Sequence, residues 1–398
     1  MTDSLVQHYL DRHAEKLDTR AVRVERGAID RCYDLLADQL DEGPWLVVYD
    51  ADTWEAAGQR FVQVLEAAGR DWHGFELEAE PGHDYPICTD AVIDECQAAM
   101  MEHGCAAGIA VGSGTINDTV KMAAHNLDRP MGVIGTAPSM NGYTSGISAI
   151  LSDGVKTTNP CTAPRVVIAD LDVMAEAPQR MICSGLGDLM SKPVSNSDWA
   201  LSARLNGTPH SAEAMEIIEE GAAALEGVAP KLPERDREAM RGLVQSLMLS
   251  GIAMSVAGSS SPASGGEHLV SHYIDMTAHA FDKPYDFHGC QVGVGTLVSS
   301  YLWKKLSEYD PADLDIEARV AQLEPWEEYE ERLRERFGPV FGAVVTHAEP
   351  GYPSPDELRE RLERLVDQWE EALQEASRTL RTPDSLEAEL ESAECPTR

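Results

Sequence analysis

The sequence predicts an α/β domain with an open parallel sheet, followed by a domain made only of helices. In the first part of the chain, short apolar runs alternate with segments of helical spacing, the pattern of consecutive βαβ units. After residue 170 the strand signals stop, and helical periodicity continues to the end. A chain of 398 residues is long enough for two cores. We therefore expect an α/β domain over residues 1–170 and a helical domain over residues 171–398.

Buried strands are expected wherever a short apolar run is bounded by turn residues. The clearest is WLVVY at residues 45–49, which ends at Asp50 and precedes a helical pattern. Helices of this length between strands indicate parallel pairing. The predicted strands are residues 45–49, 104–111, 131–134 and 165–169, and the predicted helices between them are residues 53–68 and 114–126.

The second half is expected to contain helices only. The last of these, over residues 356–380, is long, charged and amphipathic. An acidic stretch at 384–394 is expected to be a solvated tail. The other predicted helices are residues 178–204, 211–225, 235–257, 266–280 and 291–306.

Charge and composition exclude several classes of function. The chain has 68 acidic and 32 basic residues and a net charge of −36, which makes nucleic acid and anionic membranes poor partners. Only eight of the basic residues are lysine, and strong acidity with few lysines suggests adaptation to high salt. An acidic enzyme without such adaptation is the alternative. No apolar stretch is expected to reach the roughly 18 residues needed to span a bilayer, and the N-terminus lacks the pattern of a signal peptide. Eight scattered cysteines without a CxxC pair suit reduced, buried thiols, and we expect a cytoplasmic protein.

A glycine-containing turn follows the second predicted strand. Residues 112–118 (GSGTIND) lie between this strand and a helix, so backbone N–H groups and the positive end of the helix could receive a pyrophosphate. The third glycine of the usual dinucleotide pattern is absent, with Asp118 near its position. An ordinary strand-to-helix turn would look similar.

Asp50 and a hydroxyl-rich segment are further candidates for cofactor contacts. At the end of a strand, Asp50 could accept hydrogen bonds from ribose hydroxyls, which would favour NAD over NADP, or it could simply cap a helix. Residues 136–145 (TAPSMNGYTS) are dense in hydroxyl groups after a short strand. Such a loop suits hydrogen bonding to a cofactor or substrate.

Three glycine-flanked fragments carry potential metal ligands. They are SGLGD at 184–188, GGEH at 265–268 and HGCQVG at 288–293. Asp188, His268 and His288 would supply one carboxylate and two imidazoles, which suit zinc, nickel or iron and leave a position open for substrate. His272 lies four residues after His268, on the same helical face. Ordinary packing roles for these histidines are the alternative.

Five motifs in order resemble the sn-glycerol-1-phosphate dehydrogenase family. They are GSGTINDTVK at 112–121, TAPSMNGYTS at 136–145, SGLGD at 184–188, GEHLVSH at 266–272 and HGCQVG at 288–293. The resemblance is greatest to the bacterial branch and covers about residues 20–310. It places the chain with the iron-type alcohol dehydrogenases, glycerol dehydrogenase and dehydroquinate synthase.

The resemblance implies a fold and a reaction. The fold would be a Rossmann-like dinucleotide-binding domain and a helical metal-binding domain with the active site between them. The reaction would be the NAD(P)H-dependent reduction of dihydroxyacetone phosphate to sn-glycerol 1-phosphate, with NAD(H) preferred, NADP(H) as the alternative and one divalent metal ion. We also expect a homo-oligomer.

Roles for individual residues follow from the resemblance. Asp188, His268 and His288 would hold the metal, Asp188 and His272 would act in catalysis, and Asn141, Asp188 and His272 would contact substrate. The residues that would contact the dinucleotide are Asp50, Gly112, Ser113, Gly114, Thr115, Ile116, Asn117, Asp118, Thr136, Ala137, Pro138, Ser139 and Ser145.

One position departs from the family pattern. Asn141 stands where the family has a substrate-contacting aspartate, and an amide carries no charge. The reaction type is therefore better determined than the substrate. Reduction of a phosphonate aldehyde or another small carbonyl, a lyase reaction like that of dehydroquinate synthase, and an acidic binding protein with a vestigial site are the alternatives. The cations that could receive an anionic substrate are Lys121, Lys156, Arg165 and Lys192, which the sequence does not rank.

Overall fold

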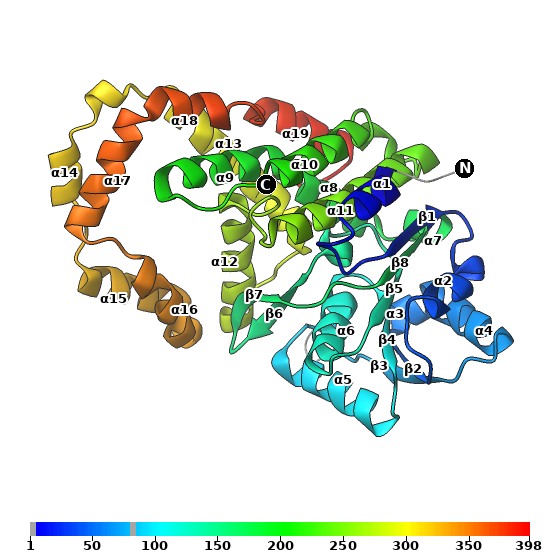
Figure 1. The fold of residues 1–398 in the computed structure, drawn as a ribbon. Coiled ribbons are helices and arrows are strands. Elements are labelled where there is room, and N and C mark those ends of the chain that lie inside the picture. Colours follow the sequence, from blue (N-terminus) through cyan, green and yellow to red (C-terminus); the bar gives the residue numbers. More distant parts are fainter. Residues whose placement is uncertain (1–4, 80–84) are drawn as a thin grey trace.

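The computed structural model describes residues 5–79 and 85–398. Its first half is built on a six-stranded parallel sheet (Figure 1). The strand order is β1-β8-β5-β4-β2-β3, and every neighbouring pair is parallel. This confirms the predicted fold class. The strands are β1 (Ala21–Glu25), β2 (Trp45–Tyr49), β3 (Trp72–Glu76), β4 (Ala107–Gly112), β5 (Met131–Gly135) and β8 (Val166–Asp170).

Both faces of this sheet are buried, as continuous apolar strands require. In β2, Trp45 and Val47 pack in one core cluster, whereas Leu46 and Val48 pack in the other. The alternation follows from the two-residue period of a strand. Helices therefore cover both faces, which is the arrangement of all-parallel sheets.

Different helices cover the two faces. One core contains residues of η1, α2 and α4, and the other contains residues of α5 and α6. The helices are α1 (Leu5–Arg12), α2 (Tyr33–Ala37), α3 (Ala51–Thr53), α4 (Gln59–Ala67), α5 (Asp90–Glu102) and α6 (Gly114–Asn126), with a 3₁₀ turn η1 (Ile29–Arg31) and a π-helical segment η2 (Trp54–Gly58).

A separate antiparallel hairpin follows β5. It consists of β6 (Ile147–Ser152) and β7 (Val155–Pro160) and lies beside helix α12 (Gly266–Phe281) (Figure 1). The buried ammonium of Lys121 holds its base by donating to the backbone oxygens of Gly142 and Ile147, both at 2.8 Å. This hairpin, β1 and β3 were not predicted from the sequence.

The second half is helical, as predicted. Its long predicted helix over 178–204 is divided at Ser191, and the one over 356–380 is divided at Gln368. The first group of helices is α7 (Leu171–Glu176), α8 (Gln179–Met190), α9 (Lys192–Asn206), α10 (Ala212–Ala224), α11 (Arg237–Ala257), α12 (Gly266–Phe281) and α13 (His288–Ser307).

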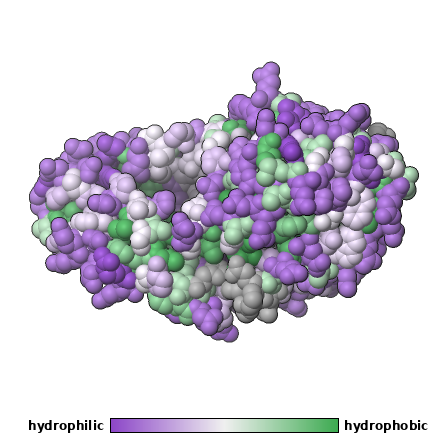
Figure 2. Space-filling model, turned by 90° about the horizontal axis from the view of Figure 1, so that it is seen from below, coloured by the Kyte–Doolittle hydropathy of each residue, from purple (hydrophilic) through white to green (hydrophobic). Residues whose placement is uncertain are grey.

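Helices α14–α17 form an arm that leaves the helical body and returns through α18 (Figure 1). The arm touches the body at α9 and at α12, and at α12 the rings of Tyr273 and Phe337 lie 5.4 Å apart. Seen from below, hydrophobic residues on this side form small groups among hydrophilic ones (Figure 2). The helices are α14 (Ile316–Ala321), α15 (Trp326–Phe337), α16 (Phe341–Ala348), α17 (Pro355–Asp367), α18 (Trp369–Ala376) and α19 (Pro383–Ser392).

Two sequence expectations about single segments need correction. Helix α11 is 21 residues long and apolar enough to cross a membrane, so the expectation that no stretch reaches this length was wrong. Its most apolar window is 78% buried inside the protein, as in the core helix of a globular chain. The acidic stretch at 384–394 forms helix α19, whose Leu386 and Leu390 are fully buried, rather than a solvated tail.

The last strand of the sheet ends at Asp170, beside the predicted domain boundary at residue 171, which stays a prediction. Helix α1 does not pack only within the α/β part. It contacts α11, and Arg12 donates to Glu216 of α10 at 2.5 Å. The N-terminal segment therefore joins the two halves.

Candidate active site

The predicted dinucleotide turn lies at the carboxyl edge of the sheet. Strands β2 and β4 are neighbours, with Val48 opposite Ala110, so Asp50 and Gly112 follow the same ends of adjacent strands. The chain runs from β2 outward to β3 and then returns to β4 on the other side of β2. Ligands of open α/β sheets bind at such a reversal of strand order.

The start of helix α6 is suited to an anion. Its N-cap residue Ser113 makes no side-chain capping bond, which leaves backbone N–H groups available to a ligand. At Gly114 an added Cβ would meet only Met140, at 3.9 Å, so there is room above the turn. Gly112 has a packing reason instead, because a Cβ there would lie 2.5 Å from Ile116.

Asp50 is an N-cap. Its Oδ1 accepts from Thr53 N at 2.8 Å, and Asp50 N donates to Thr53 Oγ1 at 2.9 Å, which completes a capping box. The capping alternative weighed from the sequence is therefore present. A contact between its second oxygen and ribose stays a prediction.

Asp118 and Asn117 face the protein interior. Asp118 Oδ2 accepts from Ala149 N at 3.1 Å, which ties α6 to the β6–β7 hairpin. The fully buried Asn117 donates to Asp118 Oδ1 at 3.1 Å, and its Oδ1 accepts no hydrogen bond from any residue the structure describes. The structure thus gives Asp118 a structural task, while Asn117 keeps a free acceptor.

Loop 136–145 joins the turn to the helical half. Ser139 Oγ hydrogen-bonds Ser113 Oγ, and its backbone oxygen accepts from Ser184 Oγ of α8 at 2.9 Å. Two residues further along the loop, Asn141 contacts Asp188. The other predicted cofactor residues of this loop, Thr136, Ala137 and Ser145, are buried, and Pro138 O packs against Gly185.

The predicted metal ligands come together from three helices. Asp188 lies near the end of α8, His268 in the first turn of α12 and His288 at the start of α13. His268 Nε2 is 3.7 Å from Asp188 Oδ1, and the rings of His268 and His288 are centred 5.1 Å apart. His272 joins them, 6.0 Å from His288 and 6.4 Å from His268 between ring centres.

Glycines allow these helices to approach so closely. An added Cβ at Gly187 would lie 2.2 Å from Gly289 O, and one at Gly289 would lie 1.8 Å from Ser184 O. At Gly185 it would lie 1.8 Å from Pro138 O. The glycines beside the predicted ligands therefore serve backbone packing between α8, α13 and loop 136–145.

Two histidines of the cluster are oriented by a hydrogen bond on Nδ1. His268 Nδ1 lies 2.8 Å from Glu267 Oε1, and His288 Nδ1 lies 3.0 Å from Ser271 Oγ. Metal-binding histidines usually have such a partner on the nitrogen that does not face the ion. Glu267 and Ser271 were missed from the sequence, although both lie in the GEHLVSH motif beside the histidines they contact.

Asp188 is buried and strongly hydrogen-bonded. Its Oδ1 accepts from Lys192 Nζ at 2.9 Å and from Asn141 Nδ2 at 3.2 Å, and its Oδ2 accepts from Asn141 N at 3.1 Å. Burial acts to raise its pKa, but the Lys192 ammonium and the neighbouring His268 outweigh this and lower the pKa well below the usual value. Asp188 is therefore a carboxylate at neutral pH.

The histidines are shifted in different directions. Burial acts to lower the pKa of His268, but Asp188 and Glu267 outweigh it and raise the pKa. Burial lowers the pKa of His272 to about 4 and that of His288 well below its ordinary value. His272 and His288 are neutral at pH 7, which leaves a lone pair available on each ring.

The donor set fits a divalent metal ion. Among the residues that the structure describes, no His, Cys, Asp and Glu side chains are drawn together as a bound ion would draw them. The separation of 3.7 Å between Asp188 Oδ1 and His268 Nε2 is still close to the roughly 3.4 Å expected for two ligands of a tetrahedral ion with bonds of about 2.1 Å. One carboxylate and two oriented imidazoles are the ligands that zinc, nickel and iron accept.

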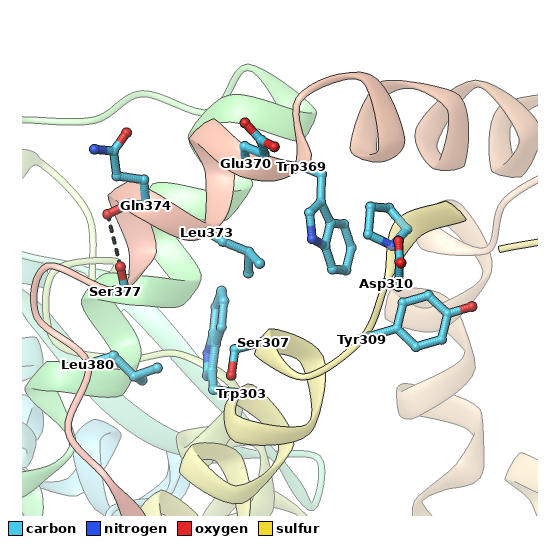
Figure 3. A pocket seen from close by; sticks show the side chains of 11 residues that line it. Trp303, Ser307, Tyr309, Asp310, Trp369, Glu370, Leu373, Gln374, Ser377 and Leu380 are labelled. Carbon is cyan, nitrogen blue, oxygen red and sulfur yellow. Dashed lines mark hydrogen bonds between the residues drawn. The ribbon is translucent and has the colours of Figure 1, made fainter. Parts of the chain in front are cut away.

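A separate cavity lies elsewhere in the molecule. It has a volume of about 640 Å³ and is lined by residues such as Trp303, Tyr309 and Trp369 (Figure 3). Its α13 residues lie near the end of that helix, whereas His288 begins it, roughly 25 Å away at 1.5 Å per residue. None of its lining residues is a predicted site residue.

Comparison with known proteins identifies the family of this chain. Residues 23–178 match the model of the iron-containing alcohol dehydrogenase family. Over 277 residues the chain is 34% identical to a protein of Pyrococcus horikoshii named NAD(P)⁺-dependent glycerol-1-phosphate dehydrogenase, with 67% of this chain and 74% of that one covered. The chain belongs to the glycerol-1-phosphate dehydrogenase family.

Bacterial members of the glycerol-1-phosphate dehydrogenase family are also similar. A Bacillus subtilis member is 36% identical over 240 residues, which cover 58% of this chain and 61% of that protein. The match to a Bacillus licheniformis member is 31% identical and covers 74% of each chain. The chain thus spans less than two thirds of the Bacillus subtilis relative but about three quarters of the Pyrococcus horikoshii and Bacillus licheniformis relatives.

Solved structures agree on the fold. A probable glycerol dehydrogenase from Sinorhizobium meliloti superposes with a TM-score of 0.60 at 19% identity, covering 90% of this chain and 98% of that one. Glycerol dehydrogenase from Schizosaccharomyces pombe gives a TM-score of 0.58 at 21% identity, with 94% and 90% covered. At these identities the likeness shows the architecture alone.

Proposed function

We propose that this protein is a metal-dependent NAD(P)H oxidoreductase that reduces a small phosphorylated ketone. The favoured reaction is that of dihydroxyacetone phosphate to sn-glycerol 1-phosphate. One observation carries the proposal: loop 136–145 hydrogen-bonds the turn at Ser113 on one side and Asp188 on the other. A dinucleotide on that turn and a substrate at Asp188 would therefore meet at this loop.

The binding roles follow from the contacts. Asp188, His268 and His288 would hold the ion, with Glu267 and Ser271 keeping the two imidazoles in orientation. The start of α6 would receive the pyrophosphate. The chemistry that the bound groups supply is Lewis-acid polarisation of the carbonyl oxygen and hydride from the reduced dinucleotide.

The chain's own residues would position the substrate, and solvent would supply the proton that the reduced oxygen takes up. Neutral His272 lies beside His288, so its ring N–H could donate a hydrogen bond to the substrate oxygen. Lys192 and Asn141 hold the Asp188 carboxylate in place.

Asn141 keeps a second substrate class open. Its amide donates to Asp188 and to Ser250 Oγ, both at 3.2 Å, where a carboxylate could donate to neither. A substrate other than the family's, such as a phosphonate aldehyde, is therefore the second candidate. A lyase reaction like that of dehydroquinate synthase would regenerate the cofactor within each cycle.

NADH absorbance tests the proposal directly. The purified protein, loaded in turn with zinc, nickel or iron, is mixed with NADH or NADPH and a panel of ketone and aldehyde phosphates and phosphonates. Stoichiometric NADH oxidation with dihydroxyacetone phosphate is expected. Turnover without net NADH loss would instead indicate the lyase, and oxidation with only the phosphonate aldehyde would identify the second candidate.

A further inference from the structure

The sequence offers four cations that could bind an anionic substrate, and the structure shows which of them already have partners within the protein. Lys121 is fully buried and engaged by Asp118 and two backbone oxygens. Lys192 is 4% exposed and bound to Asp188, Ser191 and the backbone oxygen of Ala263. Both ammonium groups are therefore already engaged in hydrogen bonds within the protein.

Arg165 is on the wrong side of the sheet. It immediately precedes β8 (Val166–Asp170), so it lies at the amino edge, whereas the site is at the carboxyl edge. Its guanidinium donates to Asp18 O at 3.4 Å. It cannot reach a substrate at Asp188.

Lys156 remains. It belongs to β7 (Val155–Pro160), the hairpin strand that packs against α12 (Figure 1). Among the described residues, nothing forms a hydrogen bond or a close ion pair with its half-buried ammonium. His268, His272 and Asp275 share one face of α12 at a spacing of four and then three residues. Burial is the main cause of the pKa shifts of His272, Asp275 and His288, and the positive charge of Lys156 is a further cause that lowers each pKa.

We propose that Lys156 binds the phosphoryl headgroup of the substrate, whether phosphate or phosphonate. The inference rests on the proposed function. In a three-carbon ketone phosphate the headgroup is a few bonds from the carbonyl, so its cation must border the Asp188–His268–His288 cluster without being part of it. Lys156 meets this condition. A net charge of −36 repels an anion from the protein, which makes a local free ammonium necessary.

A rival role for Lys156 is as counter-charge to Asp275. Asp275 is 8% exposed, and its Oδ1 accepts from Gln291 Nε2 at 3.1 Å. No ion pair within 4 Å joins it to Lys156 in the described part of the chain. A counter-charge role would affect all substrates equally, whereas a headgroup role affects only phosphorylated ones.

The experiment compares substrates with and without the headgroup. Lys156→Met, Lys156→Arg and the control Lys231→Met are assayed as metal-loaded enzymes with NADH against dihydroxyacetone phosphate, dihydroxyacetone and a phosphonate aldehyde. Lys231 is exposed and follows the short turn at Ala229, so its loss changes the net charge equally without touching the site. Lys156→Met should raise KM for the phosphorylated or phosphonylated substrate roughly 10- to 100-fold and leave its kcat within about twofold.

The same variant should leave KM for dihydroxyacetone unchanged, and Lys156→Arg should restore most of the phosphate preference. Inorganic phosphate, measured by calorimetry on the metal-loaded protein, gives a readout without turnover, and its affinity should fall in Lys156→Met alone. Equal losses on phosphorylated and plain substrates, or unchanged phosphate affinity, would overturn the inference. If the wild type reduces none of these carbonyls but still binds phosphate through Lys156, the proposed function fails and the headgroup site stands.

Discussion

Asn141 contacts the Asp188 carboxylate twice, through its side-chain amide and its backbone N–H. The side-chain amide also reaches Ser250. The residue that departs from the family pattern is therefore a donor to Asp188, and its contact with substrate stays a prediction. A carboxylate at this position would have to share the site with Asp188.

Asn141→Asp should destabilise the metal-free protein by roughly 1–3 kcal/mol, because a donor to a buried charge is replaced by a second negative charge. Thermal unfolding with and without added zinc measures this, and the ion should recover most of the loss. Asn141→Ala is the control that removes the donor without adding charge. The same Asp variant should gain activity on dihydroxyacetone phosphate relative to other carbonyls; unchanged relative rates would mean that position 141 does not select the substrate.

The partners of the two metal-facing imidazoles provide a second prediction. Glu267→Gln and Ser271→Ala should each weaken zinc binding by roughly 10- to 100-fold, since the ring they orient would lose its fixed direction. A chelator titration measures the affinity without any assay of turnover. Glu219→Gln, an exposed change on α10, is the matched control. Undiminished zinc affinity in both variants would refute the assignment of the cluster.

At the scale of elements, the short helix α3 depends on its capping box. Asp50 supplies the side-chain oxygen that accepts from Thr53 N, and Thr53 returns a bond to Asp50 N. Serine can cap a helix nearly as well as aspartate but carries no charge. Substitution at this position can therefore separate the capping role from a role in cofactor choice.

Asp50→Ser should leave the free energy of unfolding nearly unchanged and narrow the preference for NADH over NADPH. Asp50→Ala should lose roughly 0.5–2 kcal/mol of stability along with the charge. Urea unfolding and kcat/KM for both cofactors measure the two effects. A wild type that already prefers NADPH would show that Asp50 does not face the adenine ribose.

At the scale of the whole molecule, the acidic surface is the dominant physical feature. Arginine residues offset some of this charge in exposed pairs, such as Arg12 with Glu216 and Arg359 with Glu317. Exposed pairs of this kind contribute little each. A net charge of −36 therefore leaves considerable self-repulsion in dilute buffer.

Tm should rise markedly between low salt and about 1 M potassium chloride, where the screening length falls to about 3 Å. Calorimetry across this range measures it, with sorbitol at equal osmolality as the control for exclusion effects. A flat response would mean that local ion pairs already compensate the acidic groups.

The thiols provide a pH prediction for the intact fold. Burial raises the pKa of Cys32, Cys88, Cys96 and Cys290 to about 12. The thiolate is the reactive form, so these groups should stay unmodified by a disulfide reagent at pH 8 and at pH 9. All eight cysteines should react once the protein is unfolded. Rapid labelling of the four thiols in the native protein would contradict their burial.

Much of this architecture could be read from residue order. The apolar runs of β2, β4, β5 and β8 predict buried strands because both faces of the sheet are covered, and helical periodicity predicts the second half. Strands β1 and β3 were not predicted because they lie at the two edges of the sheet and are only partly apolar. The division of α8 from α9 at Ser191 also carries no strong local signal.

The candidate site also has some features that the sequence predicts and others that only the tertiary structure shows. The motifs around Asp188, His268 and His288 point to metal chemistry because their residue types and flanking glycines are visible locally. Only the tertiary structure pairs Asn141 with Asp188 and places the strand of Lys156 beside α12. It also engages Lys121 and Lys192 in internal hydrogen bonds. Charges far apart in the chain acquire partners only when the helices and the hairpin pack, and a sequence does not reveal which cation is left free.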